Sequence, residues 1–194
     1  VSARAAALAA SALKRSDAAA MAGLSGAVLV TGSAGYLGAA LCMTLDHLGI
    51  EYVGVDIVEA PTVHRRHHIA DVPALRQSAA GCAAILHAAA LHAPHATAWH
   101  ADEFARTNVD GARALLGLGL PMVHTSTTSL TITPRAKRRE ASGELLWLDH
   151  TAVAPDGARA ASEDDAPRNK YGRTKHAAER ACVEAAAAGA DVVI

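Results

Sequence analysis

Residues 27–38 constrain the fold more than any other stretch, because an apolar, β-branched run there ends in three evenly spaced glycines. Gly32, Gly35 and Gly38 are three residues apart, and leucines follow at helical intervals. We predict a strand, a tight turn and a helix. Gly32 can adopt a backbone conformation that a Cβ would obstruct, Gly35 allows close approach to the main chain, and Gly38 lets the helix lie tightly on the strand.

A glycine turn of this kind favours an anionic ligand. The free N–H groups of the helix's first turn and the positive end of its dipole face the turn, and a pyrophosphate suits that position. Residues 51–58 predict a second strand with Asp56 near its end, where a carboxylate can accept hydrogen bonds from both ribose hydroxyls of a dinucleotide. A carboxylate repels a 2′-phosphate, so the pattern favours NAD over NADP. The alternative is a strand, helix and strand that bind nothing, with an aspartate at the end of the second strand.

The length and composition suit one α/β domain. A chain of 194 residues can bury a sizeable core. Apolar residues make up 51% and aromatic residues only 3%, a mixture typical of alanine-rich helices packed closely on a sheet. We therefore predict a doubly wound α/β fold, with a mostly parallel sheet and helices on both faces. Residues 26–194 form this domain, and residues 1–25 are expected to be an N-terminal extension, with a transit peptide as the alternative.

Charge and cysteine usage argue against several classes of protein. The net charge is −1 and the basic residues are scattered, which favours neither nucleic acid nor a membrane as a partner. Three distant cysteines lack the spacing of a zinc site and are typical of core residues in a reducing, cytoplasmic compartment. The histidines between residues 64 and 68 have no carboxylate or cysteine to complete a metal site, so we expect no metal. The basic cluster at 135–139 is expected to be a solvated loop.

The remaining elements follow from apolar periodicity. We predict a short third strand whose end is residues 69–72, a helix from residue 73 to about 80, a fourth strand at 82–87, a helix at 102–118, a fifth strand at 121–125, a helix at 170–187 and a sixth strand at 191–194. Asp71 either caps the helix that follows it or contacts an adenine amino group, and the two roles are compatible. Asn108 is expected on a polar helix face, in a structural hydrogen bond.

Polar side chains follow the predicted fourth and fifth strands. Ser126 and Thr127 come directly after the fifth strand, at the end of the sheet where open α/β folds bind their ligands. Hydroxyl residues in an ordinary turn would look the same. Four histidines at or beyond the end of the fourth strand include candidate substrate contacts, and their spacing does not choose among them. They are His87, His92, His95 and His100.

Tyr171 and Lys175 are four residues apart, so they share one face of the predicted helix. An ammonium group near a phenol stabilises the phenolate, which favours acid/base chemistry near neutral pH. An isolated Tyr-x-x-x-Lys is more often a pair of exposed side chains. Here the glycine turn and Asp56 precede the pair, in the order expected of a cofactor-dependent enzyme.

The sequence resembles the extended short-chain dehydrogenases/reductases, a family with a Rossmann-like fold whose best-known members are NAD-dependent sugar epimerases and dehydratases. The resemblance covers roughly residues 26–194. The matching segments are the glycine turn at 31–38, Asp56, the pair Asp71 and Val72, the strand-end motif at 87–90, Asn-Val-Asp-Gly at 108–111, the hydroxyl segment at 126–128, and Tyr171 with Lys175.

The resemblance implies a catalytic role for four side chains. Tyr171 is then the general acid/base on a substrate hydroxyl or carbonyl, and Lys175 tunes it while binding the nicotinamide ribose. Thr127 hydrogen-bonds the reacting oxygen, with Ser126 as the alternative, and hydride passes between the substrate carbon and the nicotinamide. The implied cofactor-binding residues are Gly32, Gly35, Tyr36, Leu37, Gly38, Asp56, Asp71, Val72, Ala88, Ala89 and Lys175.

The resemblance also implies a small-molecule substrate, such as a nucleotide sugar, and a homodimer. The sequence departs from the family in two respects. Members continue beyond the sixth strand into a C-terminal region that supplies much of the substrate pocket, whereas this sequence stops at Ile194. The segment 131–167 is longer than in many members and is expected to cover part of the site. A non-catalytic dinucleotide-binding module, or a truncated remnant, is therefore the alternative to an enzyme.

Overall fold

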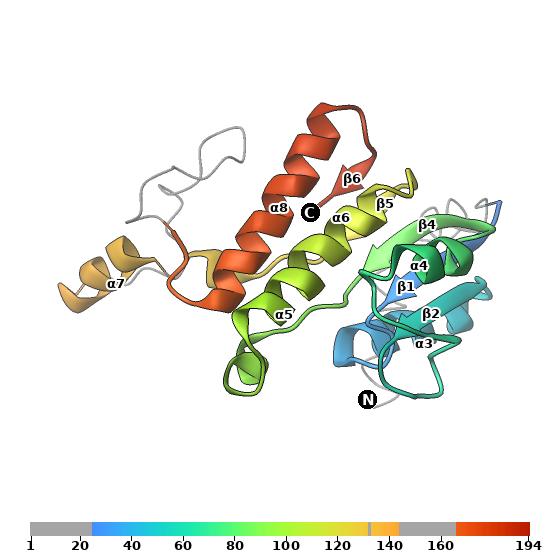
Figure 1. Ribbon diagram of the computed structural model, residues 1–194, viewed down its shortest axis with the longest axis horizontal. Coiled ribbons are helices and arrows are strands. Elements are labelled where there is room, and N and C mark those ends of the chain that lie inside the picture. Colours follow the sequence, from blue (N-terminus) through green and yellow to red (C-terminus); the bar gives the residue numbers. More distant parts are fainter. Residues whose placement is uncertain (1–24, 132, 144–165) are drawn as a thin grey trace.

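The computed structural model describes residues 25–131, 133–143 and 166–194. These residues form one six-stranded sheet in the order β3-β2-β1-β4-β5-β6, and all neighbouring strands are parallel (Figure 1). The strands are β1 (Ala27–Thr31), β2 (Tyr52–Asp56), β3 (Arg65–Arg66), β4 (Cys82–His87), β5 (Met122–His124) and β6 (Val192–Val193). The strand order reverses between β1 and β4, which is where open parallel sheets form a ligand crevice. The predicted doubly wound α/β fold is confirmed.

Helices cover both faces of the sheet. On one face, α3 packs its buried Cys42 and Leu45 against Val28 and Val30 of β1. On the other face, α4, α6 and α8 enclose a larger core that includes Leu29, and α6 and α8 lie side by side there (Figure 1). The helices are α3 (Tyr36–Leu48), α4 (Val72–Ser78), α5 (Ala101–Ala105), α6 (Gly111–Leu116), α7 (Pro134–Ala141) and α8 (Lys170–Ala187).

A π-helical turn, η2 (Arg106–Asp110), joins α5 to α6 within the helix that was predicted at 102–118. Asn108 lies in this turn with only 1% of its surface exposed. Its side-chain oxygen accepts a hydrogen bond from the Leu91 N–H, and its amide donates to the Leu91 carbonyl and to the Thr174 hydroxyl. The predicted structural hydrogen bond is confirmed, but the predicted polar face is wrong because Asn108 points into the protein.

Two other local predictions are wrong. The third strand was predicted to end at residues 69–72, but it is Arg65–Arg66, which pairs with Val55 and Asp56 at the sheet edge. Both arginines are exposed, so this edge strand has none of the apolar pattern that marks a buried one. The basic cluster, predicted as a loop, forms α7, which stands apart from the sheet at the left of Figure 1.

Several predictions on helix ends and the core are confirmed. The Asp71 carboxylate caps α4 by accepting a hydrogen bond from the Ala74 N–H at 3.2 Å. The three cysteines are buried and free. Within the described ranges, no helix combines the length and apolarity needed to cross a bilayer. The predicted extension at 1–25, except residue 25, and most of the segment 131–167 lie outside the described residues.

Candidate active site

A cleft of about 670 Å³ opens where β1, β2, β4 and β5 end. It brings together eleven of the predicted site residues: Gly32, Gly35, Tyr36, Leu37, Gly38, Asp56, Ala88, Ala89, Ser126, Tyr171 and Lys175. Three others, Asp71, Val72 and Thr127, do not line it. The glycine turn, the acidic strand end and the Tyr-Lys pair are far apart in sequence, and one concave surface holds all three.

The glycine turn leaves no room for side chains where backbones meet. Gly32 has the left-handed φ of 71°, and a Cβ on it would lie 2.6 Å from the backbone nitrogen of Ala89. A Cβ on Gly38 would lie 2.0 Å from the Gly32 carbonyl oxygen. The N-cap of α3 is Gly35, which offers the helix's first turn no side-chain acceptor. The first-turn residues Tyr36 and Leu37 line the cleft, so the positive end of α3 is directed into it.

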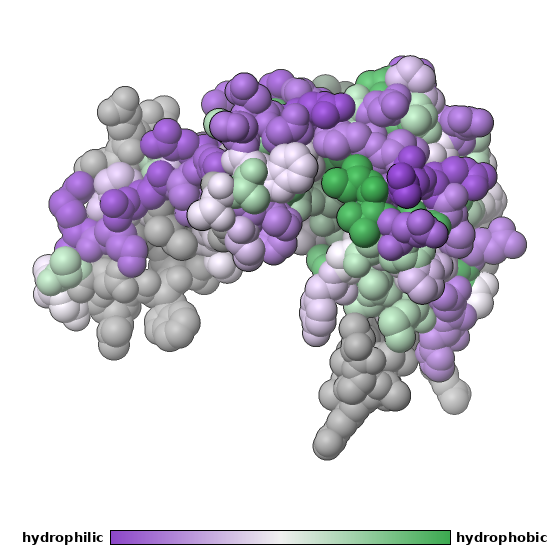
Figure 2. Space-filling model, turned by 60° about the horizontal axis from the view of Figure 1, so that its bottom comes forward, coloured by the Kyte–Doolittle hydropathy of each residue, from purple (hydrophilic) through white to green (hydrophobic). Residues whose placement is uncertain are grey.

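The Asp56 carboxylate is held beside this turn by backbone donors. Its Oδ2 accepts from the Ala34 N–H at 3.0 Å, and its Oδ1 accepts from the N–H groups of Ile57 and Val58 at 2.7 and 3.1 Å. Because a carboxylate oxygen can accept two hydrogen bonds, Oδ2 keeps capacity for a ligand hydroxyl. Ile57 and Val58 line the cleft and are 52% and 58% exposed. Figure 2 shows apolar side chains gathered among hydrophilic ones on one face of the molecule.

Lys175 reaches the cleft from inside the protein, with 3% of its surface exposed. Its ammonium donates hydrogen bonds to the Thr125 carbonyl and to Nε2 of His124, the latter at 3.2 Å. Burial lowers the pKa of Lys175 to about 8, with Cys182 and Glu179 acting in the opposite direction. The side chain is therefore charged at neutral pH, and one of its three N–H donors is left for a ligand.

The hydroxyls after β5 have partners of their own. Ser126 donates from Oγ to the Glu179 carboxylate of α8 at 2.6 Å. Thr127 accepts at Oγ1 from the Ser129 N–H at 3.2 Å. Of the two alternatives, Ser126 lines the cleft and Thr127 does not.

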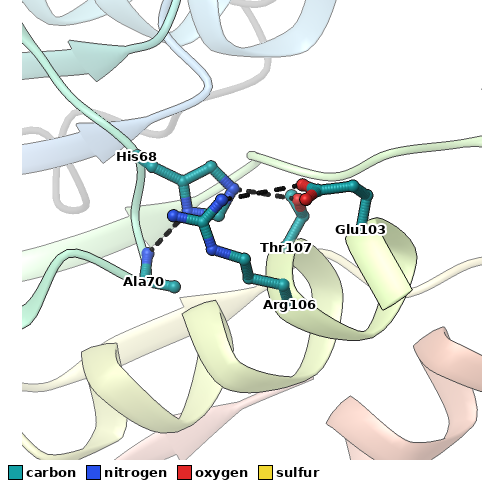
Figure 3. Close-up of polar contacts among 5 residues, drawn as sticks. All are labelled: His68, Ala70, Glu103, Arg106 and Thr107. Carbon is teal, nitrogen blue, oxygen red and sulfur yellow. Dashed lines mark hydrogen bonds and ion pairs between the residues drawn. The ribbon is translucent and has the colours of Figure 1, made fainter. Parts of the chain in front are cut away.

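His68 lines the cleft and joins the segment after β3 to the π-helical turn (Figure 3). Its Nδ1 accepts from the Ala70 N–H at 3.0 Å, so the neutral ring carries its proton on Nε2, which donates to the Thr107 hydroxyl at 3.0 Å. Burial and the nearby Arg106 guanidinium lower the pKa of His68. Arg106 pairs with Glu103 one turn earlier at 3.7 Å. The ring is therefore neutral at pH 7, and its hydrogen bond to Thr107 holds the segment after β3 against the π-helical turn.

The opposite wall comes from the loop after β4, in which His92, His95 and Trp99 line the cleft. His95 accepts at Nδ1 from the His92 N–H at 3.1 Å, and burial lowers its pKa. Lys170 joins this loop to the start of α8, because its ammonium donates to the Trp99 carbonyl at 2.5 Å and lies 5.0 Å from the centre of the Phe104 ring. His100, the fourth candidate histidine of this region, precedes α5 and does not line the cleft.

Sequence reasoning missed several cleft residues. The apolar pair after Asp56 gave a usable signal, because it lies within the predicted strand 51–58, at the strand end where Asp56 was expected to meet a ligand. His68 and Trp99 gave none, since each lies in a turn with no recognisable pattern. Thr107 lies within the predicted helix 102–118, whose apolar period does not indicate a ligand contact. Among the described residues, no group of three or more His, Cys, Asp or Glu side chains is placed to hold a metal ion.

A parallel sheet with this strand order, a glycine turn after its first strand and an acidic end to its second defines a Rossmann-like dinucleotide-binding class. The sequence profile of the NAD dependent epimerase/dehydratase family matches residues 28–194. The chain therefore belongs to that family. No curated protein sequence matches it.

Solved structures with the same fold include enzymes of this kind. A UDP-glucose-4-epimerase from Stenotrophomonas maltophila, with bound NAD and formylated UDP-arabinopyranose, is 26% identical with a TM-score of 0.64 over 86% of this chain and 50% of its own. MoeE5 in complex with UDP-glucose and NAD is 30% identical, with a TM-score of 0.56 over 86% of this chain and 52% of its own. A short-chain dehydrogenase/reductase superfamily protein from Agrobacterium tumefaciens with bound NAD is 25% identical, with a TM-score of 0.58 over 79% and 43%. The chain thus spans about half the length of the solved structures that it matches.

Proposed function

We propose that this chain binds NAD in the cleft and, with it, catalyses oxidation, epimerisation or dehydration at a hydroxyl or carbonyl carbon of a nucleotide sugar. The observation that carries the proposal is that the glycine turn, Asp56 and the Tyr171–Lys175 pair line one cleft of about 670 Å³. That volume is within the usual range for small-molecule sites. The family match and the NAD-bound neighbours support it.

The residues at the adenosine end of the cleft fit NAD. The uncapped first turn of α3 receives the pyrophosphate, because its N–H groups and the helix dipole favour negative charge there. Asp56 accepts a hydrogen bond from a ribose hydroxyl through Oδ2. Its negative charge opposes a 2′-phosphate, so NADP binds more weakly. Asp71 has its carboxylate engaged as the α4 cap, so an adenine contact there is an additional role.

The residues at the other end of the cleft handle the substrate proton. When bound, NAD supplies a hydride acceptor and donor. Tyr171 exchanges the proton of the substrate oxygen, and Lys175 stabilises its phenolate and binds the nicotinamide ribose with its remaining N–H. Ser126 or Thr127 holds the substrate oxygen.

Calorimetric titration of the chain with NAD and NADP tests the cofactor proposal. We expect NAD to bind at least tenfold more tightly than NADP, and Asp56→Ala to reduce this preference. Gly35→Val places a side chain in the cleft and abolishes binding, whereas the control Gly117→Val, at the end of α6, binds NAD as the parent does. Equal affinity of the Gly35 variant and its control would contradict the proposed site.

Turnover of a panel of nucleotide sugars with NAD tests the catalytic proposal. Tyr171→Phe should reduce kcat by a factor of about 10² to 10⁴, the usual contribution of a general acid/base, while leaving NAD affinity unchanged. Full turnover by Tyr171→Phe would rule out this acid/base. Tight NAD binding without turnover of any sugar would favour a second function, a non-catalytic dinucleotide-binding module. A homodimer is tested by light scattering on the same sample.

A further inference from the structure

Two buried histidines lie behind the catalytic pair and have no part in the chemistry proposed above. His87 at the end of β4 is 2% exposed, and His124 at the end of β5 is 1% exposed. They are paired in the sheet register, and their ring centres are 5.0 Å apart. Thr31 pairs with His87 on the other side and contacts its Nδ1 at 2.7 Å. A buried polar row thus runs across three strand ends, from the glycine turn to Lys175.

The contact between this row and Lys175 fixes the protonation state of His124. A lysine ammonium is only a donor, so the His124 Nε2, at 3.2 Å from Lys175 Nζ, must accept and cannot carry a proton. The neutral ring then carries its proton on Nδ1. A protonated ring would place two cations side by side in a buried site. Accordingly, burial first and Lys175 second lower the pKa of His124 to about 3.

The rest of the row reinforces a neutral His124. Burial, His124 and Lys175 together hold the pKa of His87 well below its ordinary value. His87 Nε2 and His124 Nδ1 have no hydrogen-bond partner among the described residues, so a proton added to either ring would leave an unpaired buried cation. From α8, the groups that act on Lys175 are Glu179 and Cys182. The direct ammonium acceptors come from β5, and they are the Thr125 carbonyl and the His124 ring.

We propose that His124 is a positioning residue for Lys175: its neutral imidazole accepts one ammonium N–H at Nε2 and so directs the remaining N–H into the cleft. The proposal rests on the proposed function for the use that is made of Lys175. An apolar residue in place of His124 would leave a buried ammonium N–H without an acceptor, which disfavours the charged form. A side chain with a lone pair at this position acts together with the Thr125 carbonyl to keep Lys175 charged and fixed.

NMR of the full chain without cofactor tests the proposal directly. In the parent protein, the imidazole nitrogen shifts of His124 should show an unprotonated Nε2 and a protonated Nδ1 at pH 7, unchanged down to pH 5. The titration of the Lys175 ε-carbon should give a pKa that falls by about one unit or more in His124→Leu, because a charge-assisted hydrogen bond is lost. His124→Gln, which keeps an acceptor, should restore it, and His100→Leu, at an exposed histidine, should leave it unchanged.

A protonated Nε2 in the parent protein would overturn the proposal, and that measurement needs no variant to fold. Equal Lys175 pKa values in the Leu and Gln variants would also overturn it. These results are independent of the proposed function. If NAD fails to bind but the Lys175 pKa follows the acceptor, the positioning role stands and the function fails. If NAD binds but the Lys175 pKa is the same with and without an acceptor at position 124, the positioning role is wrong and the proposed function is unaffected.

Discussion

Because His124 is buried and neutral, we predict that acid lowers the free energy of unfolding of this protein. Replacing His124 with glutamine should remove the part of this loss that comes from the ring. The pKa of His124 falls from 6.5 to about 3 on folding. The unfolded chain therefore binds a proton between these values that the folded chain does not, and the free energy of unfolding decreases as pH falls through this window. Above pH 6.5 the ring is neutral in both states and has no effect on the pH dependence.

The magnitude follows from the two pKa values. At pH 5, which is 1.5 pH units below the unfolded pKa of 6.5, protonation of His124 stabilises the unfolded state by about 2 kcal/mol, since one unit corresponds to about 1.4 kcal/mol. The whole window corresponds to roughly 5 kcal/mol. Between pH 7.5 and pH 5, we expect the free energy of unfolding to fall by about 2 kcal/mol less in His124→Gln than in the parent, because glutamine does not titrate. Gln also keeps the acceptor for Lys175, so the lysine contributes equally to both proteins.

Urea unfolding at 25 °C and at both pH values measures the difference. His87 and the other titrating groups are common to the two proteins, and burial, the largest cause of the lowered pKa of His87, remains in the variant. The difference between the two pH dependences therefore reports mainly on His124. His100→Gln is the matched control, and its pH dependence should be that of the parent since the side chain is exposed. Equal losses for the parent and His124→Gln would show that the ring titrates normally in the folded state and would refute the reasoning.

Three further predictions concern a glycine of the cleft, Gly38, and two buried side chains, Asn108 and Phe104. Gly38→Ala should lower the free energy of unfolding by about 1–3 kcal/mol in urea, because its Cβ would lie 2.0 Å from the Gly32 carbonyl oxygen, whereas Gly117→Ala should cost less than 0.5 kcal/mol because its nearest atom is 3.4 Å away. Asn108→Ala should cost about 2–4 kcal/mol, since it leaves buried backbone groups unpaired; a loss below about 0.5 kcal/mol would contradict the role of this side chain. Phe104→Ala, at a side chain with 0% exposure, should cost about 3–5 kcal/mol, and an unchanged thermal midpoint would be inconsistent with its place in the core.

Local sequence patterns predicted the parts of the fold that rest on local physical chemistry. The turn around Gly32 was predictable because only glycine adopts its left-handed φ without strain, and the start of α4 was predictable because Asp71 is a favoured N-cap. The helix that carries Tyr171 and Lys175 was predicted with the bounds that the structure has, Lys170–Ala187. These elements carry their signals in neighbouring residues.

The features that were missed depend on contacts between distant residues. The edge strand Arg65–Arg66 is stabilised by pairing with β2, and its own residues are polar. The π-helical turn that buries Asn108 interrupts an α-helical apolar pattern for one turn only. The sequence pattern assumed a regular α-helix there, and so placed this side chain on a polar face. The contact of Lys175 with His124 joins positions 51 residues apart, and the Tyr-Lys spacing carries no information about it.

The central place of β1 has a consequence for how the protein folds. The Gly32 N–H donates to Val55 at the end of β2, and the Thr31 carbonyl accepts from Ala88 just after β4. The contact of Thr31 with His87 spans 56 residues. The surroundings of the glycine turn are thus complete only after strands from three separate parts of the chain have docked, and the entropy of closing such long loops slows that step. A dinucleotide that binds beside this turn would bind only after these strands have docked. It would therefore stabilise the native arrangement of the three strands against their separation.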